Sequence, residues 1–159
     1  MTTFEGQVVI VTGGSSGIGA AAALQFARGG AKVVIAARRN DKSEAVVRQI
    51  EALGSEGLFL QTDVTKRADI QALVEGTLTR FGRLDCAANN AGVAGPVMVP
   101  VAEIEEAGWD EVMKVNLKGV WMCMNLKTAV EWPIGREVIT LTSICTESSC
   151  HQKGELRGS

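Results

Sequence analysis

The chain has 159 residues, of which 46% are hydrophobic and 21% are charged, and its formal net charge is -2 at pH 7. These values are typical of one globular domain, and they argue against a disordered or fibrous chain and against non-specific binding to nucleic acid. The sequence shows neither a signal peptide nor an apolar run of membrane-spanning length, so we expect a cytoplasmic protein without a membrane partner.

Short apolar runs alternate with helical patterns from the N-terminus onward. Apolar runs predict strands at 8–12, 32–37, 58–61, 84–88 and 137–141. Apolar residues at helical spacing predict helices at 18–28, 41–53, 70–81 and 109–124, the second with Asp41 as its N-cap and Glu44 completing a capping box. This alternation implies an α/β fold, a Rossmann-like doubly wound parallel sheet of about five strands.

The most informative segment is VVIVTGGSSGIG, residues 8–19, in which an apolar strand runs into a glycine-rich turn that opens a helix. Unpaired backbone N–H groups at the start of a helix attract anions, and glycine lets a phosphate approach the backbone closely. The segment therefore predicts a site for the pyrophosphate of a dinucleotide, although a turn that only packs tightly would show the same glycines. A P-loop is disfavoured because no Gly-Lys-Ser/Thr follows.

The spacing of this turn is Thr12-Gly13-x-x-x-Gly17-x-Gly19, which differs from the dinucleotide fingerprint G-x-G-x-x-G. It resembles the turn of the classical short-chain dehydrogenase/reductase family. Further matches follow in family order, namely Asp63-Val64, Asn89-Asn90-Ala91-Gly92, Asn116 and Thr142-Ser143. The resemblance ends there, so we expect a dinucleotide-binding domain over 1–143, an irregular tail over 144–159, and a sheet that is incomplete at its C-terminal side.

The resemblance implies three groups of cofactor-binding residues. They are Thr12, Gly13, Ser15, Ser16, Gly17, Ile18 and Gly19 in the first turn, Asp63 and Val64 at the adenine end, and Asn90, Ala91 and Gly92 along the ribose. Asn89 is implied to pair with the backbone and stabilise the sheet. The residue types alone leave alternatives open, since Asp63 could be the N-cap of the next helix and Asn90 a turn former.

The residues after the second predicted strand bear on the choice of cofactor. A dehydrogenase that uses NAD presents a carboxylate there to the ribose hydroxyls, whereas this chain has Ala37 followed by Arg38 and Arg39. A guanidinium pairs well with a 2′-phosphate, so we expect NADP(H) to be favoured over NAD(H), with Arg38 as the phosphate contact. The alternative is that these arginines are solvated surface charges.

The resemblance also implies two catalytic residues. Ser143 would hydrogen-bond the substrate oxygen, and Asn116 would help to hold a proton-relay water. The family adds a tyrosine and a lysine, but this sequence contains no tyrosine. Ser149 and Lys153 have the spacing of that pair, yet an aliphatic hydroxyl ionises too reluctantly to replace a phenol.

Two functions follow from this comparison. The first is an oxidoreductase of this family, which transfers hydride between NAD(P)(H) and a small-molecule alcohol/carbonyl pair. The second, suggested by the missing tyrosine and lysine, is a non-catalytic nucleotide-binding or assembly module. We expect no metal site, because the spacing of Cys145, Cys150 and His151 matches no zinc pattern. Members of the family are commonly dimers or tetramers, which implies a homo-oligomer through the helix at 109–124.

Overall fold

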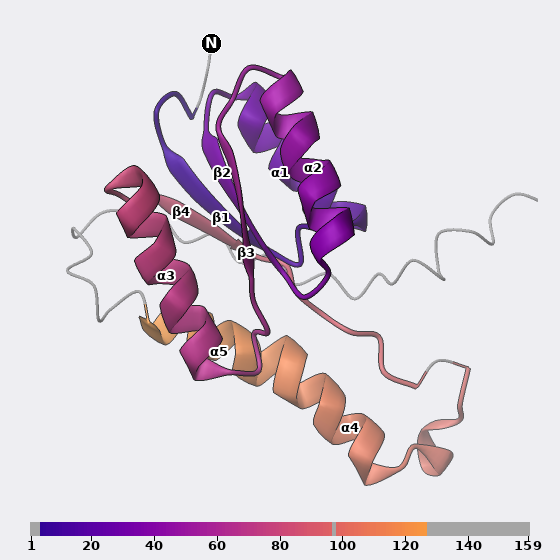
Figure 1. Cartoon of the computed structure of the whole chain (residues 1–159). Helices are drawn as coiled ribbons and strands as arrows, with labels where there is room; N and C mark the ends of the chain where they lie inside the picture. Colours follow the sequence, from indigo (N-terminus) through magenta and orange to yellow (C-terminus); the bar gives the residue numbers. More distant parts are fainter. Residues whose placement is uncertain (1–3, 97, 127–159) are drawn as a thin grey trace, which may run out of the picture.

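The computed structural model describes residues 4–96 and 98–126, in which strands and helices alternate (Figure 1). The strands are β1 (Val8–Thr12), β2 (Lys32–Ala37), β3 (Gly57–Gln61) and β4 (Cys86–Asn89). The α-helices are α1 (Gly17–Arg28), α2 (Asn40–Ala52), α3 (Arg67–Phe81), α4 (Glu106–Val112) and α5 (Val120–Leu126). A 3-10 helix, η1 (Val101–Glu103), precedes α4, and a π-helix, η2 (Met113–Gly119), joins α4 to α5.

The four described strands form one parallel sheet in the order β3-β2-β1-β4. From β1 the chain moves outward through β2 to β3, and β4 then lies on the other side of β1. Thr12 at the end of β1 is in register with Ala36 of β2 and with Asn89 of β4. The strand order therefore reverses at β1, and open α/β sheets bind ligands at such a reversal, beyond the carboxyl ends of the strands.

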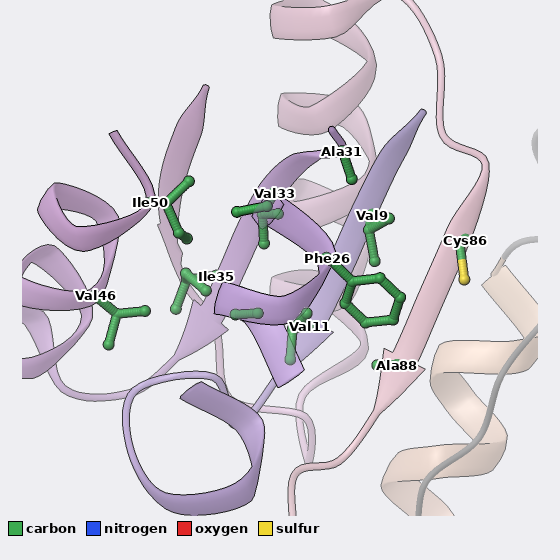
Figure 2. Close-up of a cluster of buried hydrophobic side chains, with 12 residues drawn as sticks. Val9, Val11, Phe26, Ala31, Val33, Ile35, Val46, Ile50, Cys86 and Ala88 are labelled. Atoms are coloured by element: carbon green, nitrogen blue, oxygen red, sulfur yellow. The ribbon is translucent and has the colours of Figure 1, made fainter. Parts of the chain in front are cut away.

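Helices cover both faces of the sheet, which confirms the doubly wound architecture. On one face, side chains of β1 and β2 pack against α1 and α2, with Phe26 of α1 beside Val9 (Figure 2). On the other face, Leu73 of α3 packs with Val8 and Ile10. Since alternate residues of a strand point to opposite faces, all five residues of β1 are buried. This double burial explains why the first strand reads as a continuous apolar run.

The first four predicted strands agree with the structure to within two residues at each end. The first two have the predicted bounds, and the third begins one residue earlier, at Gly57. The fourth begins at Cys86 rather than at residue 84, because Asp85 meets β1 partly through its side chain. The Asp85 carboxylate accepts a hydrogen bond from the N–H of Val8 at 2.9 Å and forms an ion pair with Arg83 at 2.7 Å. The strand predicted at 137–141 and the tail at 144–159 lie outside the described residues.

The start of α2 differs from its prediction. The helix begins at Asn40 with Arg39 in the N-cap position, so the capping box of Asp41 and Glu44 is wrong. Ser43 gives the physical reason: its backbone N–H and its hydroxyl both donate to the carbonyl of Arg39. That side chain is fully buried, which fixes the earlier start of the helix.

The predicted long helix is present and contains an irregular centre. Helical residues run from Glu106 to Leu126 through α4, η2 and α5. The wider π turns lie over Met113–Gly119 and include Asn116. Short π segments within α-helices are frequent at functional sites, so this irregularity draws attention to Asn116.

Candidate dinucleotide site

The glycine-rich turn lies at the carboxyl end of β1, where the strand order reverses. The N–H of Gly13 donates to the carbonyl of Ala36 at 2.8 Å, which holds the turn against β2. The helix α1 then begins at Gly17 with Ser16 in the N-cap position, and the Ser16 side chain makes no capping hydrogen bond. The first turn of α1 contains no acidic residue. Its N-terminal amides and positive dipole end are therefore not offset by a side chain of the helix itself.

The glycines of the turn are required for two different reasons. A Cβ at Gly13 would lie 2.8 Å from the Cα of Ala91, and a Cβ at Gly19 would collide with the carbonyl of Gly13 and the amide of Asn90. These two glycines therefore allow close packing between parts of the chain. Gly17 is different, because it has a φ of 55° and no heavy atom within 4 Å of the position of a Cβ. The open space beside the backbone in this turn lies at Gly17.

Asn90 joins the end of β4 to the glycine-rich turn. Its side-chain Nδ2 donates to the carbonyls of Thr12 at 3.2 Å and Gly13 at 3.3 Å. The Thr12 hydroxyl in turn accepts from the N–H groups of Asn90 at 3.0 Å and Ala91 at 3.1 Å. Asn90 is only 7% exposed, yet its Oδ1 has no hydrogen-bond partner among residues 4–96 and 98–126. A buried acceptor without a donor fits a ligand that supplies the donor, such as a ribose hydroxyl.

Asp63 follows β3 and organises the turn before α3. Its Oδ1 accepts from the N–H of Thr65 at 3.0 Å and from the Thr65 hydroxyl at 2.8 Å. Burial acts to raise the pKa of Asp63, but the Thr65 hydrogen bonds and the charges of Lys66 and Arg38 hold that pKa below its ordinary value. The helix α3 begins only at Arg67, with Lys66 in the N-cap position, so the N-cap alternative for Asp63 is wrong.

Val64 connects this turn to the long helix. It is buried and packs with Ile70 of α3 and with Met122 and Cys123 of α5. A Cβ at Gly119 would lie 3.1 Å from Cγ2 of Val64, so the π-helix approaches Val64 closely. The position of the turn after β3 therefore depends on both α3 and the long helix.

The two arginines after β2 have different surroundings. Arg39 reaches the glycine-rich turn, where its Nη2 donates to the hydroxyls of Ser15 at 3.2 Å and Ser16 at 2.8 Å. Both arginines are exposed, and the charge of Arg38 acts on Asp63. The prediction placed both arginines after the second strand and named Arg38 as the phosphate contact, but it gave no contact between Arg39 and the glycine-rich turn. The opposite directions of successive side chains at the end of a strand are the signal that could have separated the two residues.

Asn116 uses its whole amide to hold the segment after β4. Its Oδ1 accepts from the N–H of Val93 at 2.8 Å, and its Nδ2 donates to the carbonyl of Val93 at 2.9 Å. This pair of bonds fixes the backbone two residues after Ala91, next to the glycine-rich turn. The side chain thus positions a loop through one acceptor bond and one donor bond.

Comparison with known proteins identifies the family. A model of the short chain dehydrogenase family matches residues 7–150. The chain belongs to the short-chain dehydrogenase family. An uncharacterized oxidoreductase of Listeria monocytogenes is 44% identical over 118 residues, which are 74% of this chain and 47% of that protein. The short chain dehydrogenase/reductase astE of Aspergillus oryzae is 39% identical over 144 residues, which are 89% of this chain and 55% of that protein.

A solved structure supports the same fold. This short-chain dehydrogenase superposes on the 3-ketoacyl-(acyl-carrier-protein) reductase of Brucella melitensis, crystallised with NADH, with a TM-score of 0.74 and 35% identity. The similarity covers 80% of this chain and 50% of that one. The short-chain dehydrogenase thus spans about half the length of the relatives that it matches.

The structure of this short-chain dehydrogenase brings together most of the predicted cofactor residues. The turn at 12–19 meets Asn90 and Ala91 directly, whereas Asp63 and Val64 lie two strands away, at the end of β3. Ile18 and Gly92 are exposed at the same edge of the sheet as the turn and the end of β4. Ser143 lies outside the described residues, as do Ser149, Lys153 and the cysteines and histidine considered for a metal.

Within 4–96 and 98–126, no cluster of three or more His, Cys, Asp or Glu side chains is arranged to hold a metal ion. In the same part of the chain, no helix has the length and apolar character needed to cross a membrane.

Proposed function

We propose that this chain binds NADP(H) in preference to NAD(H), and that the protein transfers hydride between this cofactor and a small-molecule alcohol/carbonyl pair in the cytoplasm. The observation that carries the proposal is the surroundings of Asn90. Its buried and unpartnered Oδ1 lies in the side chain that bridges β4 to the glycine-rich turn, next to the start of α1. A donor from the cofactor would satisfy that oxygen, while the open backbone at Gly17 leaves room for a phosphate.

Each segment of the site has a proposed part in binding. The N-terminal amides of α1 at Gly17, Ile18 and Gly19 hold the pyrophosphate, with Thr12, Gly13, Ser15 and Ser16 shaping the turn. The adenine lies against Asp63 and Val64, and the ribose lies along Asn90, Ala91 and Gly92. The bound nicotinamide supplies or accepts the hydride.

The preference for NADP(H) rests on the end of β2. Ala37 occupies the position from which a carboxylate would bind the ribose hydroxyls, and the exposed Arg38 follows it. A guanidinium there attracts a 2′-phosphate, and a carboxylate would repel it. The related reductase from Brucella melitensis was crystallised with NADH, so the preference depends on these residues of this chain and not on that relative.

The substrate side of the proposal involves Ser143 and Asn116. Ser143 would donate a hydrogen bond to the substrate oxygen. Asn116 would keep the segment after β4 in place through its two bonds to Val93 and would help to hold the relay water. The substrate contact of Ser143 and the relay-water role of Asn116 are carried over from the family resemblance.

A second candidate function is cofactor binding without turnover. The sequence contains no tyrosine, and the family relies on a tyrosine to give or take the proton. In this case the chain would serve as a nucleotide-binding or assembly module, with the same contacts to the dinucleotide.

The assembly that we propose uses the long helix. Trp109 and Leu117 are each 60% exposed, and Trp121 and Met124 on the same helix are also exposed. Large apolar side chains spread along one helix favour contact with a second copy, so we propose a homo-oligomer through 109–124.

One experiment separates the two candidate functions. The full chain is titrated with NADPH and with NADH, and oxidation of NADPH is then followed with a panel of small ketones. Saturable binding with turnover that is lost in Ser143→Ala supports the oxidoreductase. Binding without turnover supports the module, and a folded chain that binds neither dinucleotide contradicts both.

A further inference from the structure

The Arg39 side chain donates hydrogen bonds to the protein itself, in the glycine-rich turn. Its Nη2 donates to two hydroxyls of the glycine-rich turn, at 2.8 Å to Ser16 and 3.2 Å to Ser15. Ser15 is only 7% exposed, so one of the two acceptors is embedded in the fold. Ser16 is the N-cap residue of α1. The guanidinium thus bonds to the turn at the buried Ser15 and at Ser16, the residue from which α1 starts.

The backbone of Arg39 is fixed at the other end of this contact. Arg39 is the N-cap residue of α2, and its carbonyl accepts hydrogen bonds from the N–H and the hydroxyl of Ser43. The helices α1 and α2 lie side by side on one face of the sheet (Figure 1). One side chain therefore ties the beginning of α2 to the beginning of α1.

The backbone of the glycine-rich turn is stabilised by such a contact. Gly13 and Gly17 have φ values of 68° and 55°, and glycine has more backbone freedom to lose than any other residue. Gly17 also has no atom packed beside it. Ala36 and Asn90 hold the turn at Gly13, and Arg39 adds contacts at Ser15 and Ser16, between Gly13 and the start of α1.

We propose that Arg39 is a positioning residue that holds the glycine-rich turn in its cofactor-binding shape, while the neighbouring Arg38 distinguishes NADP(H) from NAD(H). The inference rests on the proposed function and deepens it. Arg39 acts on the part that both dinucleotides share, the pyrophosphate. Arg38 is exposed directly after β2, and its proposed role is at the part that differs, the 2′-phosphate.

The two roles give different patterns of binding. Arg39→Ala is expected to weaken the binding of NADPH and of NADH by the same factor, about tenfold, because it removes charge-assisted hydrogen bonds to the turn. Arg38→Ala is expected to weaken NADPH at least about tenfold more than it weakens NADH. Arg48→Ala removes an equal charge from an exposed position of α2 and serves as the control, with both affinities kept.

A double-mutant cycle tests whether Arg39 acts through Ser16. If it does, Ser16→Ala weakens binding in the wild type and has little further effect in Arg39→Ala. Additive losses would instead mean that Ser16 and Arg39 contact the cofactor separately, which contradicts the positioning role. Arg39→Lys, which keeps the charge and a donor, should recover more affinity than Arg39→Met.

Hydrogen exchange of the ligand-free chain separates this inference from the proposed function. Arg39→Ala should speed exchange of the Ala20 amide, which donates to the carbonyl of Ser16, by about tenfold and leave the amides of β1 and β2 unchanged, whether or not a dinucleotide binds. Unchanged exchange at Ala20 overturns the inference, as does an Arg39→Ala chain that loses NADPH affinity alone. A wild type that binds neither dinucleotide overturns the proposed function and the cofactor-positioning role with it, while the exchange result still reports on the contact itself.

Discussion

Asn90 donates two hydrogen bonds to Thr12, and these bonds join the ends of two neighbouring strands. The N–H of Asn90 donates to the Thr12 hydroxyl at 3.0 Å, and Nδ2 of Asn90 donates to the Thr12 carbonyl at 3.2 Å. Because this pair lies where the strand order reverses, it sets the distance between β4 and the glycine-rich turn.

Removal of the Thr12 hydroxyl should destabilise the fold strongly for so small a change. Thr12→Val keeps the shape of the side chain and removes the acceptor of the Ala91 N–H, while the N–H of Asn90 keeps its bond to the carbonyl of Ala88, so we expect a cost of about 2 kcal/mol in unfolding free energy. Thr77→Val is the matched control, because the buried Thr77 hydroxyl donates only to the carbonyl of Leu73 within α3 and its loss should cost about 1 kcal/mol or less. Denaturant titrations measure both variants, and equal losses would refute the role assigned to Thr12.

A methyl group at Gly19 should be far more costly than one at Gly76, although both glycines lie in helices. Gly19→Ala collides with a backbone carbonyl and with the Asn90 amide, so we expect a loss of at least about 2 kcal/mol. At Gly76 the nearest atom is Cδ1 of Leu60, 3.0 Å away at the end of a flexible side chain, and the gain in helix propensity offsets the crowding. Thermal unfolding should place Gly76→Ala within about 1 kcal/mol of the wild type. A Gly19→Ala variant as stable as Gly76→Ala would show that the turn and Asn90 are not tightly packed.

The ionisation of Asp63 should make stability sensitive to acid. Its pKa in the folded chain lies below the ordinary value of 3.8, so the stabilisation is complete above that value and is lost as the pH falls through the lower folded pKa. Thr65→Ala removes one of the two bonds to the carboxylate and should move the folded pKa back toward 3.8. A carboxyl NMR titration measures both values. An Asp63 pKa above 3.8 in the wild type would contradict the assignment of the Thr65 bonds.

The fold could be predicted closely from sequence where one physical cause dominates. Residues 8–12 and 32–37 are buried on both faces, and their continuous apolar runs gave the correct strand bounds. The start of α2 was predicted wrongly, because the buried Ser43 bonds back to Arg39 and competes with the capping preference of Asp41. Local preference cannot reveal which serine is buried by the rest of the fold.

The candidate site was predictable as a set of segments and less so as a set of contacts. The spacing of the glycines and the Asn89-Asn90-Ala91-Gly92 segment marked the correct edge of the sheet. The unpartnered oxygen of Asn90 and the contact of Arg39 with the two serines depend on how separate segments meet in space. The two hydrogen bonds of Asn116 to the backbone of Val93 likewise depend on the π turns of the long helix, for which the sequence carries no simple pattern.

The exposed apolar side chains of the long helix should drive self-association. We expect the full chain to form dimers or larger homo-oligomers in sedimentation experiments, and we expect Leu117→Glu to weaken the association at least about tenfold, because it places a charge in an apolar contact. Lys118→Glu changes charge at the next, exposed position of the helix and should have a smaller effect. A wild type that stays monomeric at high concentration would rule out this interface.

The central claim, that the glycine-rich turn binds a dinucleotide, is tested most directly by one pair of variants in a binding titration with NADPH. Gly17 and Gly54 both have positive φ and open space beside the backbone, so alanine imposes a similar backbone strain at each. Only Gly17 lies at the start of α1, whereas Gly54 lies just beyond the end of α2. We predict saturable binding that Gly17→Ala weakens at least about tenfold and Gly54→Ala leaves unchanged. A folded chain that does not bind NADPH, or equal effects of the two variants, would contradict the claim.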